Sequence, residues 1–299
     1  MYKKFSLVLL LLSAIAHSQK YVDLLSVNYN HSSPTSYGNS QEKTALSNFE
    51  IALTIPVVIN AKYVFITGLD YNKNAVAIPN YMNNSLFLTR LKAGLRVNYS
   101  EKWSGTYLFL TKVASDYVTT TSNDLYLGGA AVFKYTKNKN SNFKLGIYAS
   151  EEAYGLFVTP LIGMYYKSPS SKLEMSVTFP TDFDLNYSAT PKTKIGLDYS
   201  AIGKSYRITT ENSRSSYIEN NSLQFAAYIQ NNSLYKNILF RIKVGVSTNE
   251  YDVYSINEKV DFRVSAFKFG DHRTQLNEKL SSSPFIMLES IYRFDLPSK

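Results

Sequence analysis

The chain of 299 residues contains no cysteine, which excludes disulfide scaffolds and thiolate metal sites. It has only three histidines, so few nitrogen ligands are available for a transition metal. Beyond the N-terminus, no segment approaches the about 20 consecutive apolar residues that a transmembrane helix requires. No glycine-rich phosphate loop precedes a helical pattern. We therefore expect no cofactor and no bound metal. The sequence does not predict a membrane protein that spans the bilayer with helices.

The N-terminus carries the pattern of an export signal. Two lysines precede an apolar stretch at residues 7–12, and residues 16–18 place small side chains around one position. This arrangement is typical of a cleaved signal peptide, and the apolar stretch is too short to span a bilayer as a helix. We expect residues 1–18 to be removed and residues 19–299 to form one domain.

Short segments with an apolar residue at every second position fill the remainder of the chain. In residues 172–179 one face carries Leu173, Met175, Val177 and Phe179, and polar side chains alternate with them. A β-strand sends successive side chains to opposite faces, so each such strand has one apolar and one polar side. Behind an export signal, this repetition predicts a transmembrane β-barrel. The mean hydropathy of −0.19 agrees with a barrel, because inward polar residues dilute the outward apolar ones.

The connections between the segments alternate between short and long, as they do in outer-membrane barrels. The short ones fall at 59–61, 100–102, 137–142, 168–171, 189–192 and 231–236, and the long ones at 31–43, 73–84, 115–124, 208–219 and 252–283. Counting hairpins gives about fourteen antiparallel strands, or twelve if the pair around Pro180 is one bent strand. The sequence thus predicts an all-β antiparallel barrel in the cell outer membrane, with 25 Tyr and 17 Phe available for aromatic girdles.

Two segments near the C-terminus bear on how the barrel closes. Apolar residues alternate over 286–294, and this last strand must pair with the first, around 20–30, because an open sheet edge cannot be left in lipid. Residues 260–266 alternate like a strand but lie within the longest connection. That connection is either an extra hairpin or a loop folded inward to narrow the lumen.

Four segments carry a resemblance to a known group of proteins: residues 100–107, 165–169, 179–187 and 265–277. With them the chain resembles the uncharacterised outer-membrane β-barrels of a Bacteroidetes-type family of unknown function. The resemblance covers most of the chain after the signal peptide. It implies an outer-membrane barrel and brings no activity and no catalytic residues.

Charged residues on the polar faces are the leading candidates for function. Those expected to line the lumen are Arg90, Lys92, Arg96, Lys134, Lys144, Asp182, Asp184, Arg241 and Lys243. They can form a pore with a basic stripe that favours anions. Alternatively, they neutralise one another inside a closed barrel, because a buried unpaired charge costs several kcal/mol.

Two other patterns invite a test for chemistry. The loop segment with Lys268, Asp271, His272 and Arg273 holds a histidine, but a nucleophile needs a base and an orienting group in fixed geometry. No such set is evident, so we do not expect an enzyme. Residues 182–186 resemble the start of a calcium loop, but Tyr187 stands where that loop requires glycine.

The net charge is +9 and the basic residues are spread over many strands. A modestly basic exported barrel is suited to contact lipids and the phosphates of lipopolysaccharide. The absence of a clustered basic face argues against nucleic acid as a partner. The barrel-assembly machinery is a second expected partner. The leading function is a passive channel or an uptake pore for an unidentified small solute, and the alternative is a non-transporting structural or surface-interaction barrel that works through its outer loops.

The first prediction concerns processing and location. The mature chain should begin near Gln19 and should fractionate with the outer membrane, because the small residues before that position favour cleavage there. Mass spectrometry of the N-terminal peptide, together with membrane fractionation, provides the measurement. Recovery of most of the protein in the soluble periplasmic fraction would contradict the barrel assignment.

Overall fold

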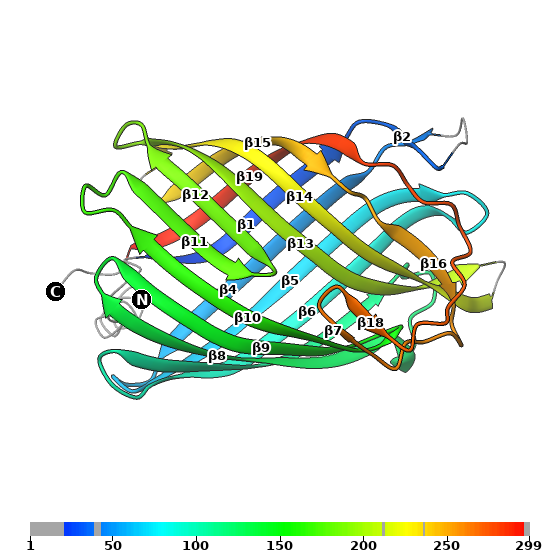
Figure 1. The fold of residues 1–299 in the computed structure, drawn as a ribbon, viewed down its shortest axis with the longest axis horizontal. Helices are drawn as coiled ribbons and strands as arrows, with labels where there is room; N and C mark the ends of the chain where they lie inside the picture. Colours follow the sequence, from blue (N-terminus) through cyan, green and yellow to red (C-terminus); the bar gives the residue numbers. More distant parts are fainter. Residues whose placement is uncertain (1–20, 39–42, 211–212, 236, 296–299) are drawn as a thin grey trace, which may run out of the picture.

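Fourteen antiparallel strands, hydrogen-bonded in sequence order, form a closed barrel in the computed structural model (Figure 1). The structure describes residues 21–38, 43–210, 213–235 and 237–295, so the expected signal peptide lies outside the described residues. The wall strands are β1 (Tyr21–Ser32), β4 (Ser47–Val58), β5 (Tyr63–Ile78), β6 (Met82–Asn98), β7 (Trp103–Ser115), β8 (Leu125–Asn138), β9 (Ser141–Glu152), β10 (Gly155–Lys167), β11 (Leu173–Phe179), β12 (Asp182–Ser188), β13 (Thr193–Thr210), β14 (Ser213–Tyr235), β15 (Ile238–Ser247) and β19 (Ser283–Asp295). The predicted all-β class and fourteen strands are confirmed; β11 and β12 are separate strands.

The first and last strands close the barrel, as the terminal pattern predicted. β19 pairs with β1 from Val22↔Phe294 to Ser32↔Phe285, and its other edge pairs with β15. The closure satisfies the backbone donors and acceptors of both end strands, which would otherwise present open edges.

Connections of two kinds lie at opposite ends of the barrel. We call the end with the short connections, such as 59–62 and 99–102, the turn end, and the opposite end the loop end. The prediction of long connections at 73–84 and 208–219 is wrong. Strands β5, β6, β13 and β14 extend through most of these residues. Their polar residues look loop-like in sequence. In the fold they point inward, where Asn74 donates to Asn72 at 2.6 Å.

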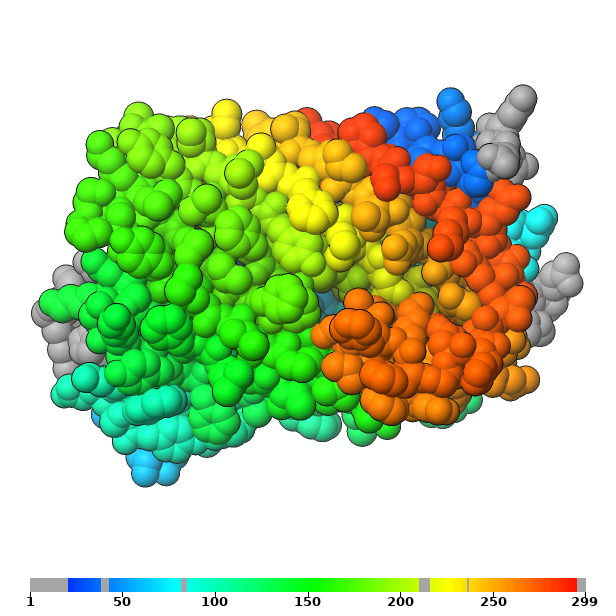
Figure 2. Space-filling model, in the orientation of Figure 1, coloured from blue at the N-terminus to red at the C-terminus, as the bar shows by residue number. Residues whose placement is uncertain are grey.

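The long connection at 252–283 contains the extra hairpin that was one of two expectations. β16 (Tyr251–Ser255) pairs with the loop-end part of β14. β17 (Phe262–Val264) and β18 (Phe267–Phe269) form a hairpin whose β17 edge lies parallel to β10. Figure 2 shows this segment in orange, seated in the wall beyond the green strands. Smaller elements are β2 (Thr35–Ser36) with β3 (Lys43–Thr44), and a 3₁₀ turn, η2, at Ser122–Asp124.

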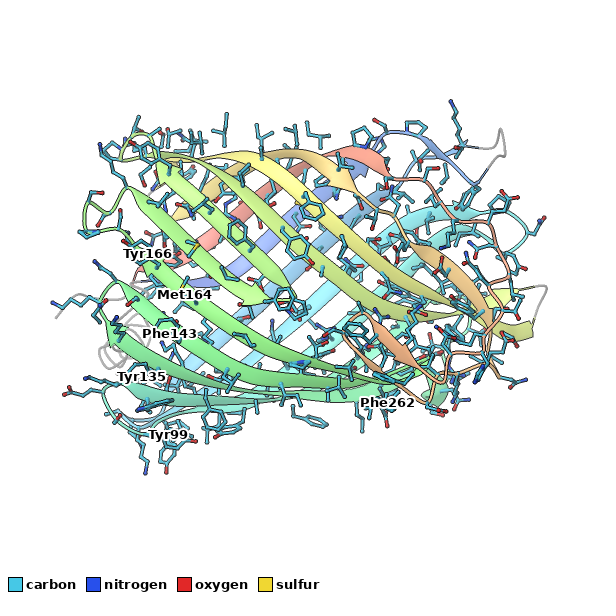
Figure 3. The ribbon with its side chains drawn as sticks, in the orientation of Figure 1. Tyr99, Tyr135, Phe143, Met164, Tyr166 and Phe262 are labelled. Atoms are coloured by element: carbon cyan, nitrogen blue, oxygen red, sulfur yellow. The ribbon has the colours of Figure 1, made fainter. Side chains whose placement is uncertain are left out.

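The outer surface of the wall is apolar. On β9, Phe143, Leu145 and Ile147 are exposed, and Leu145 keeps 63% of its surface. Large exposed apolar side chains recur on the other wall strands, so the exterior forms a belt that would favour lipid over water. Figure 3 shows Tyr99, Tyr135, Phe143 and Tyr166 gathered toward the turn end, as an aromatic girdle would be. Among the described residues, no helix is long and apolar enough to cross a membrane.

The second prediction concerns closure. Deleting residues 290–299 should abolish assembly, because it removes six of the eleven β19 pairs with β1 and three of the ten pairs with β15. The readout is the heat-dependent gel shift of a folded barrel. Deleting only 296–299 is the matched control and should leave the shift unchanged. A normal shift in the longer deletion would show that another strand closes the barrel.

Candidate functional site

Inward-facing charges on β5 and β6 pair with one another. The Nζ atom of Lys92 lies 2.6 Å from a carboxylate oxygen of Asp70, and Arg90 approaches the other oxygen at 3.8 Å. The structure therefore brings two of the predicted lumen residues to a single carboxylate, which offsets half of their local charge.

A second group of inward charges connects β12, β13, β15 and β19. Arg241 lies 3.7 Å from Asp184 and 3.5 Å from Glu289. Lys243 lies 2.5 Å from Asp198 and 3.3 Å from Glu289. Two cations and three carboxylates thus share one region of the wall. The lumen is not positively charged on this side.

The residues that resembled a calcium loop are engaged by hydrogen-bond donors. Asp184 accepts hydrogen bonds from the Tyr228 hydroxyl at 2.9 Å and from the Asn186 amide at 2.8 Å. Asp182 lies at the tip of the β11–β12 hairpin and accepts a hydrogen bond from the Thr181 hydroxyl at 2.8 Å. Donors on a carboxylate compete with a cation for the same oxygens. Across the part of the chain that the structure describes, no cluster of three or more metal-binding side chains exists.

The remaining three predicted lumen residues form what we call the basic cluster: Arg96, Lys134 and Lys144. Lys134 and Lys144 are direct cross-strand partners on β8 and β9. Arg96 donates to the amide oxygen of Asn98 at 3.3 Å. Within the described residues, none of the three has a carboxylate within 4.0 Å. Like charges directly opposite one another are destabilising, so three cations lie close together near the turn end without an ion pair among the described residues.

At the loop end, the far halves of β13 and β14 turn inward across the lumen. The structure thereby builds a cap, made of residues 205–210, 213–222 and 251–282. Tyr206 accepts a hydrogen bond from Asn74 on β5 at 3.0 Å. The Ser205 hydroxyl donates to Glu152 at 2.7 Å, and Arg207 pairs with β7. Since β7 and β13 are six positions apart in a wall of fourteen strands, these contacts span the barrel.

The cap is a packed structure with its own apolar core. Side chains of the cap that are fully excluded from solvent include Tyr206, Ile208, Tyr217, Ile218 and Val253, and Tyr154 of the β9–β10 turn belongs to the same cluster. Burial of several large side chains favours one fixed arrangement over a loose loop. The axial mouth at this end is therefore closed.

A single carboxylate holds the parts of the cap together. Glu219 on β14 is fully buried, and three cations converge on it. The guanidinium groups of Arg263 and Arg273 lie 2.7 and 2.8 Å away, and the ammonium of Lys268 lies 3.1 Å away. One buried carboxylate thus ties the connection at 252–283, at three points, to the barrel wall.

The residues of the predicted loop motif differ in their contacts: Lys268, Asp271 and Arg273 form ion pairs, and His272 does not. Arg273 donates to both oxygens of Asp271, at 2.8 and 2.9 Å, and this hydrogen bonding lowers the pKa of the Asp271 carboxyl to about 2. The guanidinium of Arg273 also lies 4.1 Å from the ring centre of Tyr254. His272 is exposed and has no hydrogen bond or ion pair within the described residues. It therefore has neither a nucleophile nor an orienting group beside it.

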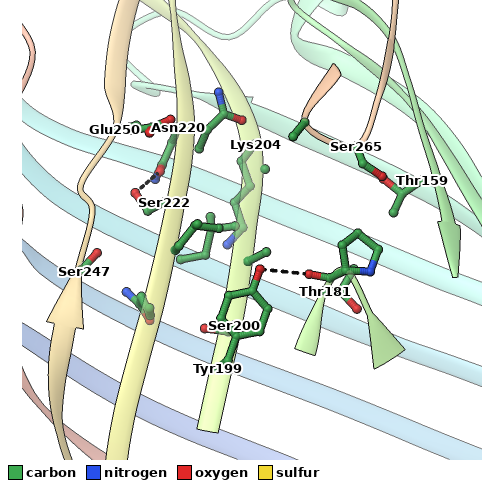
Figure 4. Close-up of a pocket in the computed structure, with 18 of the residues that line it drawn as sticks. Thr159, Thr181, Tyr199, Ser200, Lys204, Asn220, Ser222, Ser247, Glu250 and Ser265 are labelled. Atoms are coloured by element: carbon green, nitrogen blue, oxygen red, sulfur yellow. Dashed lines mark hydrogen bonds between the residues drawn. The ribbon is translucent and has the colours of Figure 1, made fainter. Parts of the chain in front are cut away.

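Beneath the cap lies a cavity of about 1030 Å³. Its polar lining includes Lys204, whose ammonium reaches toward Glu50 on the opposite wall at 3.8 Å. Thr159 lines it from β10, and its buried hydroxyl has no hydrogen-bond partner among the described residues. Figure 4 shows Lys204, Thr159 and Thr181 around this space. Apolar lining comes from Phe157, Leu161, Ile202 and Phe179. The arrangement can bind a molecule with both polar and apolar parts.

The chain belongs to a family described as a domain of unknown function (DUF6268), which matches residues 43–270. A search of curated proteins found no match.

Three solved barrels are similar in architecture. The NanC porin has 10% identity and a TM-score of 0.38, covering 90% of this chain and 98% of that one. The translocator domain of the autotransporter NalP from Neisseria meningitidis has 9% identity and a TM-score of 0.37, covering 91% and 89%. The TodX monoaromatic hydrocarbon channel, as a mutant, has 9% identity and a TM-score of 0.38, covering 96% and 92%.

Sequence reasoning missed the residues that organise the cap. Glu219 and Arg263 fall in segments that were read as connections, and Glu152 was not counted among the inward carboxylates. Lys204 was also missed, although Ile195, Leu197 and Tyr199 define an outward face whose continuation places residue 204 inward. The alternation of outward and inward side chains along β13 predicts that Lys204 faces the lumen. It does not predict which strand lies across the lumen from Lys204.

The third prediction concerns the anchor of the cap. Glu219→Gln should destabilise the cap by about 3–5 kcal/mol, because it leaves buried cations without a counter-charge. Limited proteolysis of the folded barrel should then cut within 256–282. Glu278→Gln, at an exposed carboxylate in the same segment, is the control and should stay resistant. Equal resistance of both variants would mean that Glu219 does not hold the cap.

Proposed function

We propose that the protein is an outer-membrane channel that takes up small solutes through a binding cavity in its lumen. The observation that carries this proposal is the cavity of about 1030 Å³ beneath the cap. A barrel with a purely structural role can fill its interior with side chains. Here the interior keeps a space large enough for a small molecule and lines it with hydrogen-bonding groups.

The exterior supports placement in a membrane. Exposed apolar side chains surround the wall, with Ile162, Phe225 and Ile242 each keeping more than half of their surface. Burying such side chains in lipid is favourable by about 25 cal/mol per Å² of apolar area. Strands and not helices span this belt, which in bacteria is the architecture of outer-membrane proteins.

The basic cluster supports a preference for anions. Among the described residues, Arg96, Lys134 and Lys144 have no carboxylate within 4.0 Å, and Lys134 and Lys144 face each other directly. Facing cations destabilise the fold, so their presence supports a role in binding anions or in selecting them during passage. The cluster lies toward the turn end, where a solute leaving the cavity would pass.

Two partners follow from the same placement. The exposed lysines at positions 43, 259 and 279, all at the loop end, are suited to contact lipopolysaccharide phosphates. The closing strand β19, which has aromatic residues at its end, is suited to recognition by the barrel-assembly machinery.

The alternative is a non-transporting barrel that acts through its outer surface. The packed cap favours it, since a well-ordered outer face can bind a partner and an axially closed mouth does not conduct freely. We propose no catalytic role under either alternative, because the one loop histidine, His272, stands by itself.

The fourth prediction tests conduction. In planar bilayers the purified protein should give small conductance steps, and Glu219→Gln should raise the open probability by loosening the cap. Lys134→Gln with Lys144→Gln should lower the chloride-to-potassium permeability ratio, measured from the reversal potential in a salt gradient. The double variant Lys137→Gln with Lys139→Gln, at exposed turn residues of the same hairpin, is the matched control. Silence of both the wild type and Glu219→Gln would favour the non-transporting alternative.

A further inference from the structure

One part of the barrel wall is shorter than the remainder. β11 and β12 have seven residues each, whereas their neighbours β10 and β13 have 13 and 18. The β10–β11 pairing stops at Ile162↔Phe179, and the β12–β13 pairing stops at Asp182↔Ser200. Directly beyond the tip of this hairpin, no described strand pairs with the facing edges of β10 and β13.

The β17–β18 hairpin fills only the far part of that gap. β17 pairs with β10 from Leu156 to Val158, and Ser265 adds one hydrogen bond to Val158 at 2.9 Å. Residues 159–161 of β10 and 202–204 of β13 are therefore left without a strand partner on their facing edges.

This gap is a hole through the wall. Its two edges and the hairpin tip line the same cavity that Lys204 lines from within. In Figure 2 it appears as a hollow between the green strands and the orange β17–β18 segment, with bluish atoms of the far wall visible behind it. Phe157 bounds the opening on the far side, where a Cβ added at Gly203 would lie 3.6 Å from its ring.

The opening lies within the apolar belt. On its turn-end side, Ile162 and Phe179 are 60% and 66% exposed. On its loop-end side, Phe267 is 71% exposed, and Phe262 stacks on Phe269 with ring centres 4.6 Å apart. Exposed apolar side chains on both sides place the hole at a depth where lipid and not water would surround the barrel.

The edges of the hole are suited to a polar cavity. Backbone groups cannot be left facing hydrocarbon, but they are tolerated where they line a protein cavity. Pro160, on the β10 edge, has no N–H to satisfy, as is common for proline at a strand edge. The Ser205 N–H on the continuation of β13 is satisfied by the Glu152 carboxylate at 3.1 Å. The buried Thr159 hydroxyl, which has no hydrogen-bond partner in the described part of the chain, can bond to a ligand.

We propose that this hole is a lateral portal through which small, lipid-soluble molecules with one polar head pass between the membrane and the lumen cavity. The apolar body would lie along Leu161 and Phe157, and the head would reach Thr159 and Lys204. The closed axial mouth makes the side of the barrel the route from the outer leaflet. The inference rests on the proposed function only in treating the cavity as a solute site.

The test uses the absence of cysteine from the chain. A single cysteine replaces Ala130, which lines the cavity from β8, and is labelled with bimane. The barrel is reconstituted in phosphatidylcholine vesicles containing a nitroxide-labelled medium-chain alcohol, which dissolves in the bilayer and quenches bimane on contact. Unlabelled decanol serves as the competitor.

The blocking variant is Ala201→Trp, which fills the portal beside the hairpin tip, where the Ala201 N–H donates to Thr181. Ala93→Trp, at an exposed outward position of β6, is the matched control. Quenching at position 130 should be saturable, should fall with decanol, should be lost in Ala201→Trp and should persist in Ala93→Trp. Gly203→Leu is the second blocking variant if the first does not give the folded gel shift.

Two results would overturn the portal. One is equal quenching in the blocked and control variants, which would mean that the probe enters by another route. The other is no quenching at all in the unblocked barrel. Conductance of Ala201→Trp separates this inference from the proposed function: ion flow that persists in the blocked variant leaves the channel standing, whatever the quenching shows.

Discussion

Pairing of every strand edge is the constraint on which this structure depends. In hydrocarbon an unpaired backbone N–H or C=O costs several kcal/mol, so a membrane sheet has to close on itself. The β1–β19 register provides the closure and thereby fixes both ends of the chain at one seam. Against that background the gap above β11 and β12 stands out, because it interrupts the pairing within the apolar belt. Its edges are tolerated only because they face a cavity that contains polar groups.

Charge is distributed inside the barrel in three ways. Along β12, β13, β15 and β19, cations and carboxylates neutralise one another. In the cap, Glu219 forms ion pairs with three cations of the connection at 252–283, and these ion pairs attach that connection to β14. Near the turn end, the cations of the basic cluster have no ion pair among the described residues. Of the two interpretations drawn from the sequence, neutralisation of inward charges describes the ion pairs on β12, β13, β15 and β19, and the basic stripe stays a proposal that rests on the basic cluster.

The sequence predicted the wall well because alternation is local. An outward residue such as Leu145 can be assigned from its immediate neighbours, and the fourteen strands follow from repeating that step. The cap could not be predicted in this way. Glu219 meets Arg263 and Arg273 across 44 and 54 positions of sequence, and no local pattern specifies such a contact.

The gap between β10 and β13 could not be predicted from the sequence either, because it also depends on strands that are distant along the chain. The short strands around Pro180 were visible in the sequence, but a short strand leaves a hole only if its neighbours are long. The lengths of β13 and β14 were underestimated, since their polar loop-end residues were read as a connection. Those residues are polar because they face the cap and the lumen, where their side chains bond to one another.

Amide hydrogen exchange of the barrel in lipid nanodiscs tests the central claim most directly, namely that the wall is closed everywhere except between β10 and β13. The amide of Gly203, whose N–H faces the gap, should exchange quickly although it lies at membrane depth, while the amides in the middle of β5 and β8 should be strongly protected. Uniform protection around the whole wall, with Gly203 as slow as the middle of β5, would contradict the account.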